Sequence, residues 1–302
     1  MSGGWKRRLA LAGLMGLAGI ATANAATAHR AHHRRHAVVQ PSADDPGLRS
    51  AAAYVVDRDD ASVWYSHNAQ VASPIASITK LMTALVVADA HLPLDEELQV
   101  TAADRAIGKG AASRLAVGTR LSRGELLHLA LMSSENRAAH ALGRNYPGGV
   151  PAFVNAMNAK ARALGMTATH FVEPTGLSSD NVASPEDLSR LVMAAAQNPT
   201  IRDFSTDTQL SVRVGRRMVE FRNTDALVRN PTWDIIVQKT GYITEAGRCL
   251  VMQAVIGGRD VVIVLLNSFG KYTRVADAVR VRRWIEARMN EHGAHVIASN
   301  AT

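Results

Sequence analysis

The stretch SPIASITKLMTAL (73–85) has the apolar spacing of an amphipathic helix. Counted from Ile78, apolar residues recur at i+3, i+4, i+7 and i+8, which places them on one face. Ser77 and Lys80 lie outside that face, three residues apart, so a helix places them side by side. The stretch therefore predicts a helix, buried on one face, that brings a hydroxyl next to an ammonium group at its start.

A serine next to a lysine suits nucleophilic catalysis only if the lysine is neutral. A serine hydroxyl is a weak nucleophile until a base removes its proton. Burial and a neighbouring cation both lower the pKa of a lysine, so a partly buried Lys80 can be the base for Ser77. The spacing S-x-x-K alone decides nothing, because average composition produces it about once by chance in a chain this long.

Two further motifs follow the first in sequence order. The segment Ser134–Asn136 (SEN) has the form S-x-N, and Lys239–Gly241 (KTG) stands at the end of an apolar strand predicted at 235–237. Average composition produces K-T-G in only about one chain in twenty. The order S-x-x-K, S-x-N, K-T-G is typical of penicillin-binding proteins and class A β-lactamases.

The polar residues of these motifs suit the proton transfers of acyl transfer. Ser134 can pass a proton between Lys80 and a leaving amine, and Asn136 can hydrogen-bond a substrate amide. Lys239 adds a positive charge near Ser134 and helps to keep Lys80 neutral.

The third motif and its surroundings suit substrate binding. Thr240 can bind a substrate carboxylate, and Gly241 lets a substrate strand approach the backbone closely. The backbone N–H groups of Ser77 and Tyr242 form the expected oxyanion hole. Arg248 either helps to bind a carboxylate or is an outward-facing strand residue.

Between about residues 49 and 289 the chain resembles the low-molecular-mass penicillin-binding proteins, serine D,D-peptidases of the S11 type. Besides the three motifs, the resemblance rests on SRLAVGTRLSRGELLHLALMSSENRAAHAL (113–142), HFVEPTGLSSDNVAS (170–184) and GYITEAGRCLVM (241–252). Within the family, the segments SSEN and EAGRCL are most similar to the D-alanyl-D-alanine endopeptidases of the penicillin-binding protein 7 type.

The resemblance implies a function in peptidoglycan chemistry, with the D-alanyl–meso-diaminopimelyl cross-link as substrate. It makes Ser77 the acyl-enzyme nucleophile, Lys80 the general base, and SEN and KTG the second and third motifs. It also implies covalent inhibition by β-lactam antibiotics. No cofactor is implied, and the spacing of His128 and His140 predicts no metal site.

Three other functions remain open. A D,D-carboxypeptidase that trims terminal D-alanine has the same motifs. A β-lactamase needs a base for deacylation, but no E-x-x-L-N follows the second motif, and Glu173 is expected in a loop that shapes the wall of the site. A wall-binding protein without catalysis is disfavoured because every motif residue is intact.

The fold class predicted is α+β, one antiparallel sheet flanked by helices with an inserted, mostly helical subdomain. The resemblance implies the penicillin-binding protein and serine β-lactamase-like fold. Strands are predicted at 51–56, 62–66, 210–214, 218–222, 248–256 and 261–267, and helices at 123–144, 150–164, 185–197 and 274–289. The last helix is basic, and packing on the sheet is favoured over resting on a membrane surface.

The N-terminus predicts export. Residues 1–25 have the basic start, the apolar run and the small-x-small end at Ala23–Ala25 of a signal peptide, although a retained membrane anchor stays an alternative. A basic, His-rich disordered linker is expected at 26–48, a catalytic domain at 49–291 and a flexible tail at 292–302. The expected location is the periplasm.

The formal net charge of +8 includes six basic residues of these N-terminal segments, three in each, so it overstates the basic character of the remaining chain. The remaining chain shows no basic patch, so no nucleic-acid partner is expected. The single cysteine, Cys249, cannot form an internal disulfide and is predicted to be a buried strand residue.

Overall fold

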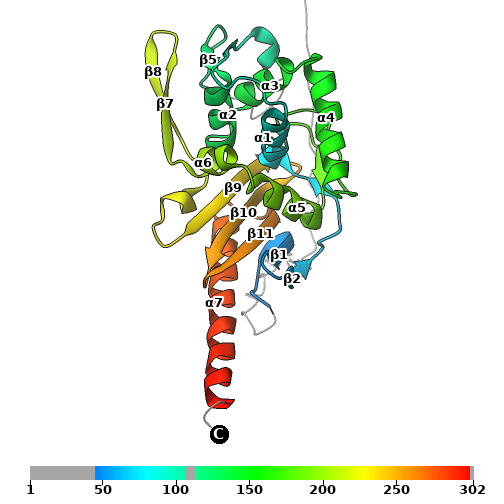
Figure 1. The fold of residues 1–302 in the computed structure, drawn as a ribbon, viewed down its shortest axis with the longest axis vertical. Coiled ribbons are helices and arrows are strands. Elements are labelled where there is room, and N and C mark those ends of the chain that lie inside the picture. Colours follow the sequence, from blue (N-terminus) through cyan, green and yellow to red (C-terminus); the bar gives the residue numbers. More distant parts are fainter. Residues whose placement is uncertain (1–44, 106–112, 300–302) are drawn as a thin grey trace, which may run out of the picture. The chain divides into compact units, whose positions relative to one another are not determined.

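The computed structural model describes residues 45–105 and 113–299. Its main sheet is antiparallel and five-stranded, in the order β2-β1-β11-β10-β9 (Figure 1). These strands are β1 (Ser50–Asp57), β2 (Val63–His67), β9 (Asp234–Ile243), β10 (Gly247–Ile256) and β11 (Arg259–Ser268). Strands from both ends of the chain therefore pair in the one antiparallel sheet that was predicted. The strands predicted at 51–56 and 62–66 form one hairpin of it, and those predicted at 248–256 and 261–267 form another.

The helices lie mostly between β2 and β9 in sequence, and Figure 1 shows α1 to α4 gathered together on one side of the sheet. They are α1 (Thr79–Asp89), α2 (Arg123–Met132), α3 (Asn136–Arg144), α4 (Gly149–Ala163), α5 (Pro185–Ala195) and α6 (Pro199–Thr206), followed later by α7 (Thr273–Ser299). Helix α6 is missing from the sequence-based prediction. Its N-terminal signals, an Asn198 cap followed by Pro199, are nevertheless present.

Short elements complete the fold, and several were too short to predict. The pairs are β3 (Ser73–Pro74) with β6 (Val182–Ala183), β4 (Glu97–Gln99) with β5 (Arg120–Ser122), and β7 (Gln209–Val214) with β8 (Arg217–Arg222). Three 3₁₀ turns are η1 (Ala76–Ile78), η2 (Ala102–Asp104) and η3 (Ala226–Arg229).

The main sheet is covered on both faces, which explains why its central strands are apolar throughout. Alternate side chains of β10 and β11 point to opposite faces, so Val251 joins the core with the inserted helices whereas Leu250 joins a second core under α7. Cys249 is fully buried in the first core, as predicted, and burial raises the pKa of its thiol to about 11. Helix α7 packs on the sheet, as favoured from the sequence.

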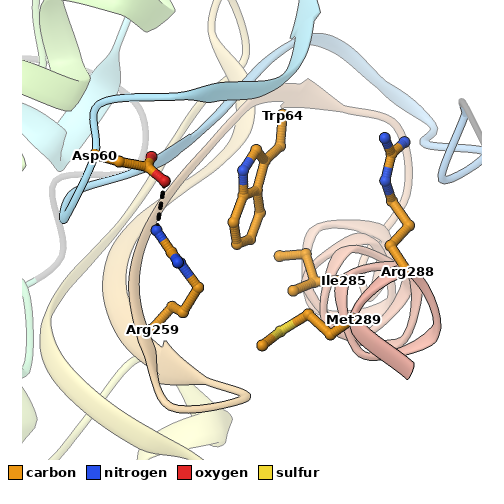
Figure 2. Close-up of a pocket in the computed structure, with 6 residues that line it drawn as sticks. All are labelled: Asp60, Trp64, Arg259, Ile285, Arg288 and Met289. Atoms are coloured by element: carbon orange, nitrogen blue, oxygen red, sulfur yellow. Dashed lines mark hydrogen bonds and ion pairs between the residues drawn. The ribbon is translucent and has the colours of Figure 1, made fainter. Parts of the chain in front are cut away.

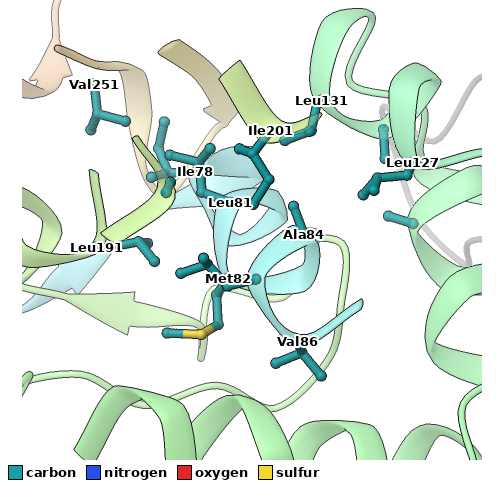
Figure 3. Close-up of a cluster of buried hydrophobic side chains, with 14 of the residues drawn as sticks. Ile78, Leu81, Met82, Ala84, Val86, Leu127, Leu131, Leu191, Ile201 and Val251 are labelled. Carbon is teal, nitrogen blue, oxygen red and sulfur yellow. The ribbon is translucent and has the colours of Figure 1, made fainter. Parts of the chain in front are cut away.

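The prediction that α1 is buried on only one face is wrong. Every residue from Thr79 to Val87 is buried, because α2, α3, α4 and α5 all contact this helix. Figure 3 shows its side chains lying among Leu131 of α2, Leu191 of α5 and Ile201 of α6. The helix is thus the central element of the first core, and the polar side chains between Thr79 and Val87 are taken out of water.

At both ends the described residues extend past 49 and 291, the predicted limits of the catalytic domain. The predicted signal peptide and most of the predicted linker lie outside the described residues, but Pro46 and Gly47 are buried and Leu48 packs against the second core. At the other end α7 continues to Ser299, so the predicted tail is helical up to that residue. None of the helices described combines the length and the apolarity that a bilayer span requires.

A cavity of about 390 Å³ lies where α7 meets the turns β1–β2 and β10–β11 (Figure 2). Trp64, Ile285 and Met289 form its apolar side. Arg259 on its polar side is paired with Asp60. No residue of the three motifs lines this cavity, so it is separate from the site described next.

Candidate active site

Ser77 lies in the turn η1, immediately before α1, and two glycines hold the backbone around it. Gly176 has a φ of +81°, and a Cβ there would lie 1.9 Å from the carbonyl oxygen of Ala76. A Cβ at Gly241 would lie 2.9 Å from the carbonyl oxygen of Ile75. Gly241 was predicted to let a substrate strand come close to the backbone. In the structure the backbone of residues 75–77 already occupies the space beside its Cα.

Lys80 is fully buried one turn after Ser77, with three oxygen atoms around its Nζ. Nζ lies 2.8 Å from Ser77 Oγ, 2.8 Å from Asn136 Oδ1 and 2.6 Å from the carbonyl oxygen of Thr175. Burial lowers the pKa of Lys80 to about 7, although Glu173 and Glu135 oppose the shift. The lysine is therefore poised to exist in both protonation states near neutral pH.

The three oxygens around Lys80 determine where its lone pair points when it is neutral. Asn136 Oδ1 and the carbonyl oxygen of Thr175 can only accept hydrogen bonds. They take both hydrogens of a neutral amine, which leaves the lone pair for the hydroxyl proton of Ser77. The arrangement can thus remove a proton from Ser77.

The second motif lies at a break between two helices, and the prediction of one helix over 123–144 is wrong. Helix α2 ends at Met132 and α3 begins at Asn136, and Ser134 has a φ of +60°. The carboxylate of Glu135 accepts hydrogen bonds from Ser113 Oγ (2.6 Å) and from the backbone N–H of Arg114 (3.0 Å). These bonds fix the loop that turns the Ser134 hydroxyl toward the third motif.

The third motif lies within β9, which continues to Ile243 although the strand was predicted to end before it. Lys239 is fully buried, and its Nζ donates to Ser134 Oγ (3.0 Å) and to the carbonyl oxygen of Thr240 (2.8 Å). Burial holds its pKa well below the usual value, and the charge of Lys80 adds to this. The sequence suggested that the charge of Lys239 would help to keep Lys80 neutral. In the structure burial lowers the pKa of Lys80, and the repulsion between the two lysines lowers the pKa of Lys239 instead.

Thr240 and Tyr242 occupy different environments on the same strand. Thr240 is buried, and its Oγ1 shares a 2.7 Å hydrogen bond with Thr224 Oγ1. Tyr242 is 55% exposed, and Arg248 of β10 stacks over its ring at 4.6 Å. Because β9 is an edge strand of the main sheet, a substrate chain can lie along it.

Glu173 belongs to a loop that forms part of the wall, as expected. Its carboxylate accepts hydrogen bonds from the backbone N–H groups of Thr175 (2.7 Å) and Gly176 (2.5 Å) and from Asn181 Nδ2 (2.9 Å). The loop so held presents the Thr175 carbonyl oxygen to Lys80. Sequence reasoning missed Thr175, because a backbone acceptor leaves no residue-type signal.

Arg274 is a second residue that sequence reasoning missed. It lies in the first turn of α7, and its Nη1 donates to the carbonyl oxygen of Gly241 at 3.2 Å. Burial lowers its pKa, and the nearby Arg248 adds to the shift. Of the two arginines, Arg274 rather than Arg248 is the one that contacts the third motif.

The two histidines considered for a metal site have other partners. His128 stacks on Phe204, with ring centroids 4.3 Å apart, and His140 Nδ1 lies 2.9 Å from Asp104 Oδ1. Within 45–105 and 113–290, no three His, Cys, Asp or Glu side chains converge as a metal site would require.

The fold and the cluster of three motifs define a serine D,D-peptidase of the penicillin-binding protein class. The crystal structure of the Streptomyces K15 DD-transpeptidase is similar, with a TM-score of 0.75 and 27% identity over 83% of this chain and all of that chain. The predicted fold is thereby confirmed.

The chain belongs to the peptidase S11 family, whose sequence profile, described as D-alanyl-D-alanine carboxypeptidase, matches residues 38–270. A D-alanyl-D-alanine endopeptidase of Pseudomonas aeruginosa is 52% identical over 79% of this chain and 78% of its own length. One of Escherichia coli K12 with the same name is 48% identical over 81% of this chain and 80% of its own length. A D-alanyl-D-alanine carboxypeptidase of Streptomyces sp. K15 is 29% identical, over 79% and 88% respectively. The family resemblance noted from the sequence is confirmed.

Proposed function

We propose that this protein is a serine D,D-endopeptidase that cleaves D-alanyl–meso-diaminopimelyl cross-links of peptidoglycan during cell-wall remodelling. The observation that carries the proposal is the contact between Ser77 Oγ and a buried lysine whose other two neighbours can only accept hydrogen bonds. The endopeptidase name shared by the relatives at 52% and 48% identity supports the choice of bond.

In the proposed reaction Ser77 forms an ester with the D-alanyl residue. Its Oγ attacks the carbonyl carbon while its proton passes to Lys80 Nζ, and the N–H groups of Ser77 and Tyr242 stabilise the oxyanion. Ser134 then gives its proton to the diaminopimelyl nitrogen and takes one from Lys80, so the amide bond breaks and the amine leaves. A water molecule hydrolyses the ester, with Lys80 as base, and restores Ser77.

The remaining groups bind the substrate. Because Asn136 uses its Oδ1 for Lys80, its amide hydrogens are available to a carbonyl oxygen of the substrate. Thr240 binds the carboxylate next to the bond that is cleaved, and Arg274 supplies positive charge beside it. A β-lactam presents an amide and a carboxylate in a similar arrangement, so we propose that these antibiotics acylate Ser77 and inhibit the enzyme.

A D,D-carboxypeptidase is the second candidate, because the family profile and one of the relatives named above have that description. Both reactions use the same acyl donor and differ only in the leaving group. β-Lactamase activity is disfavoured, because the carboxylate of Glu173, the nearest candidate for a deacylating base, accepts hydrogen bonds from the backbone and from Asn181 of its own loop.

We further propose that residues 1–25 direct export to the periplasm, where residues 49–291 act as the catalytic domain. Cell fractionation tests this, with mature protein expected in the periplasmic fraction and cleavage after Ala25 read by N-terminal sequencing. Full-length protein retained in the membrane fraction would support the anchor instead.

The proposed activity is tested with two substrates in parallel. Purified protein without its first 25 residues is incubated with cross-linked muropeptide dimers and, separately, with monomeric pentapeptide, and products are followed by mass spectrometry. Conversion of dimers to monomers by the wild type but not by Ser77→Ala is the expected result. Loss of D-alanine from pentapeptide with dimers left intact would identify a carboxypeptidase.

A further inference from the structure

Three large aromatic side chains are exposed at one end of the main sheet. Phe269 is 88% exposed, Tyr272 71% and Tyr242 55%. The sheet register aligns Tyr242 of β9 with Arg248 of β10, and Arg248 with Ser268 of β11. Phe269 directly follows Ser268, so the loop 269–272 lies at the end of the sheet where β9 leaves the third motif. We call Tyr242, Phe269 and Tyr272 the aromatic platform.

Hydrogen bonds within residues 269–276 hold the loop that carries Phe269 and Tyr272. Gly270 has a φ of +91°, the Thr273 hydroxyl donates to the carbonyl oxygen of Phe269, and the Ala276 N–H donates to that of Tyr272 at 3.0 Å. These bonds start α7 and leave the two rings in solvent. Because exposed apolar area is unfavourable, a cluster of exposed rings beside a catalytic strand indicates a binding surface.

Positive charge surrounds the platform. Arg248 stacks on Tyr242, Lys271 Nζ lies 5.3 Å from the ring centroid of Tyr272, and Arg274 contacts Gly241. Segments 241–248 and 268–274 contain these three cations and one carboxylate, Glu245. The platform therefore suits a ligand with both apolar surface and carboxylates.

The cations connect the platform to the leaving-group side of the site. Ser134, which protonates the leaving amine in the proposed reaction, contacts Lys239, and Arg274 contacts Gly241 two residues further along β9. The carboxylate expected at Thr240 and Arg274 belongs to the leaving residue. A chain that continues beyond that carboxylate passes from Arg274 toward Arg248 and the rings.

We propose that the aromatic platform binds the stem peptide that leaves on cleavage and so selects cross-linked substrate over terminal D-alanine. This inference rests on the proposed function. The methylenes of the diaminopimelyl residue lie on Phe269 and Tyr272, and carboxylates of the same stem pair with Arg248 and Lys271. A single D-alanine leaving group ends at Thr240 and is too short to reach the rings.

The test uses the double variant Phe269→Ala/Tyr272→Ala, with Val63→Ala as control. Val63 is 49% exposed on β2, the opposite edge strand of the main sheet, so its truncation removes exposed apolar surface far from β9. We expect kcat/KM for muropeptide dimers to fall about tenfold in the double variant and to stay unchanged in the control. The carboxypeptidase rate on pentapeptide and the rate of penicillin acylation stay unchanged in both.

The two substrates make the outcomes distinct, because they share the acyl donor and differ in the leaving group. Equal losses on dimer and pentapeptide would place the platform on the acyl-donor side and overturn the inference. An unchanged rate on dimers would do the same. A wild-type protein that is acylated by penicillin but leaves dimers intact would overturn the proposed function itself.

Discussion

Two clusters of buried charge in this molecule are built in opposite ways. Asp104 is buried with Arg144 Nη2 at 2.9 Å, His140 Nδ1 at 2.9 Å and the Thr101 N–H at 2.7 Å, so its charge is compensated. Lys80 is also buried, but the three oxygens that its Nζ contacts are all uncharged, and the carboxylates of Glu173 and Glu135 act on it only from further away.

The pKa values record this difference. The partners of Asp104 hold its pKa well below the usual range despite burial, which favours the charged form. Burial lowers the pKa of Lys80 to about 7, which favours the neutral form. The carboxylate of Asp104 therefore stays charged inside the fold, whereas the lysine is held near its neutral form, which is the form that a general base requires.

The largest effect is expected at Lys80. Lys80→Met removes the base and keeps the length of the side chain, so the rate of acylation by a fluorescent penicillin falls roughly 10³-fold. Lys160→Met is the matched control, because that lysine pairs with Asp89 at the surface. Thermal melts show that each variant is folded. A Lys80→Met protein that is acylated at the wild-type rate would rule out the general-base assignment.

The backbone around Ser77 comes next in expected effect. Both Gly176 (φ +81°) and Gly165 (φ +71°) have a backbone conformation that alanine rarely adopts. An alanine Cβ at 176 would in addition clash with the backbone of Ala76, whereas one at 165 would meet open space. We expect Gly165→Ala to cost about 1 kcal/mol of stability from backbone strain alone. Gly176→Ala should cost more and also slow acylation. If Gly176→Ala and Gly165→Ala lose the same amount of stability and both are acylated at the wild-type rate, the backbone at Ala76 and Ser77 can move without harm, and the prediction is wrong.

The cluster around Asp104 gives an effect that is confined to stability and leaves the rate of acylation unchanged. Asp104→Asn leaves Arg144 and His140 without their carboxylate and should cost about 3 kcal/mol, measured by urea unfolding, with acylation unchanged. Asp95→Asn, at an exposed position, is the control. Because the folded-state pKa is depressed, this contribution is present above about pH 4 and is lost on acidification. If Asp104→Asn instead slowed acylation and kept its stability, the Asp104 cluster would contribute to the reaction, and the contrast with Lys80 would be wrong.

The sequence predicted the parts of this structure that depend on residue type. The strands that form the hairpins β1–β2 and β10–β11 were predicted from their residue pattern, and the motif residues were singled out by their type and their order along the chain. Ser77, Lys80 and Asn136 are in contact, as are Lys239 and Ser134.

The missed features depend on backbone geometry and on long-range packing. The segment LMSSENRAAHAL is compatible with a helix, so the break at Ser134 was not visible. The carbonyl oxygen of Thr175 could belong to any residue type, and Arg274 reads as one of several arginines on a basic helix. Full burial of α1 depends on four other helices, which a local pattern does not reveal.

The central claim is that burial makes Lys80 a base at neutral pH, and the pH dependence of acylation tests it most directly. The rate of penicillin acylation of the wild-type protein is measured between about pH 5 and about pH 10, with melts confirming the fold. The neutral amine is required, so the rate should rise with pH and reach half its plateau near the pKa of about 7. A rate that does not change over this interval, or that rises only near the ordinary lysine pKa of about 10.4, would contradict the account.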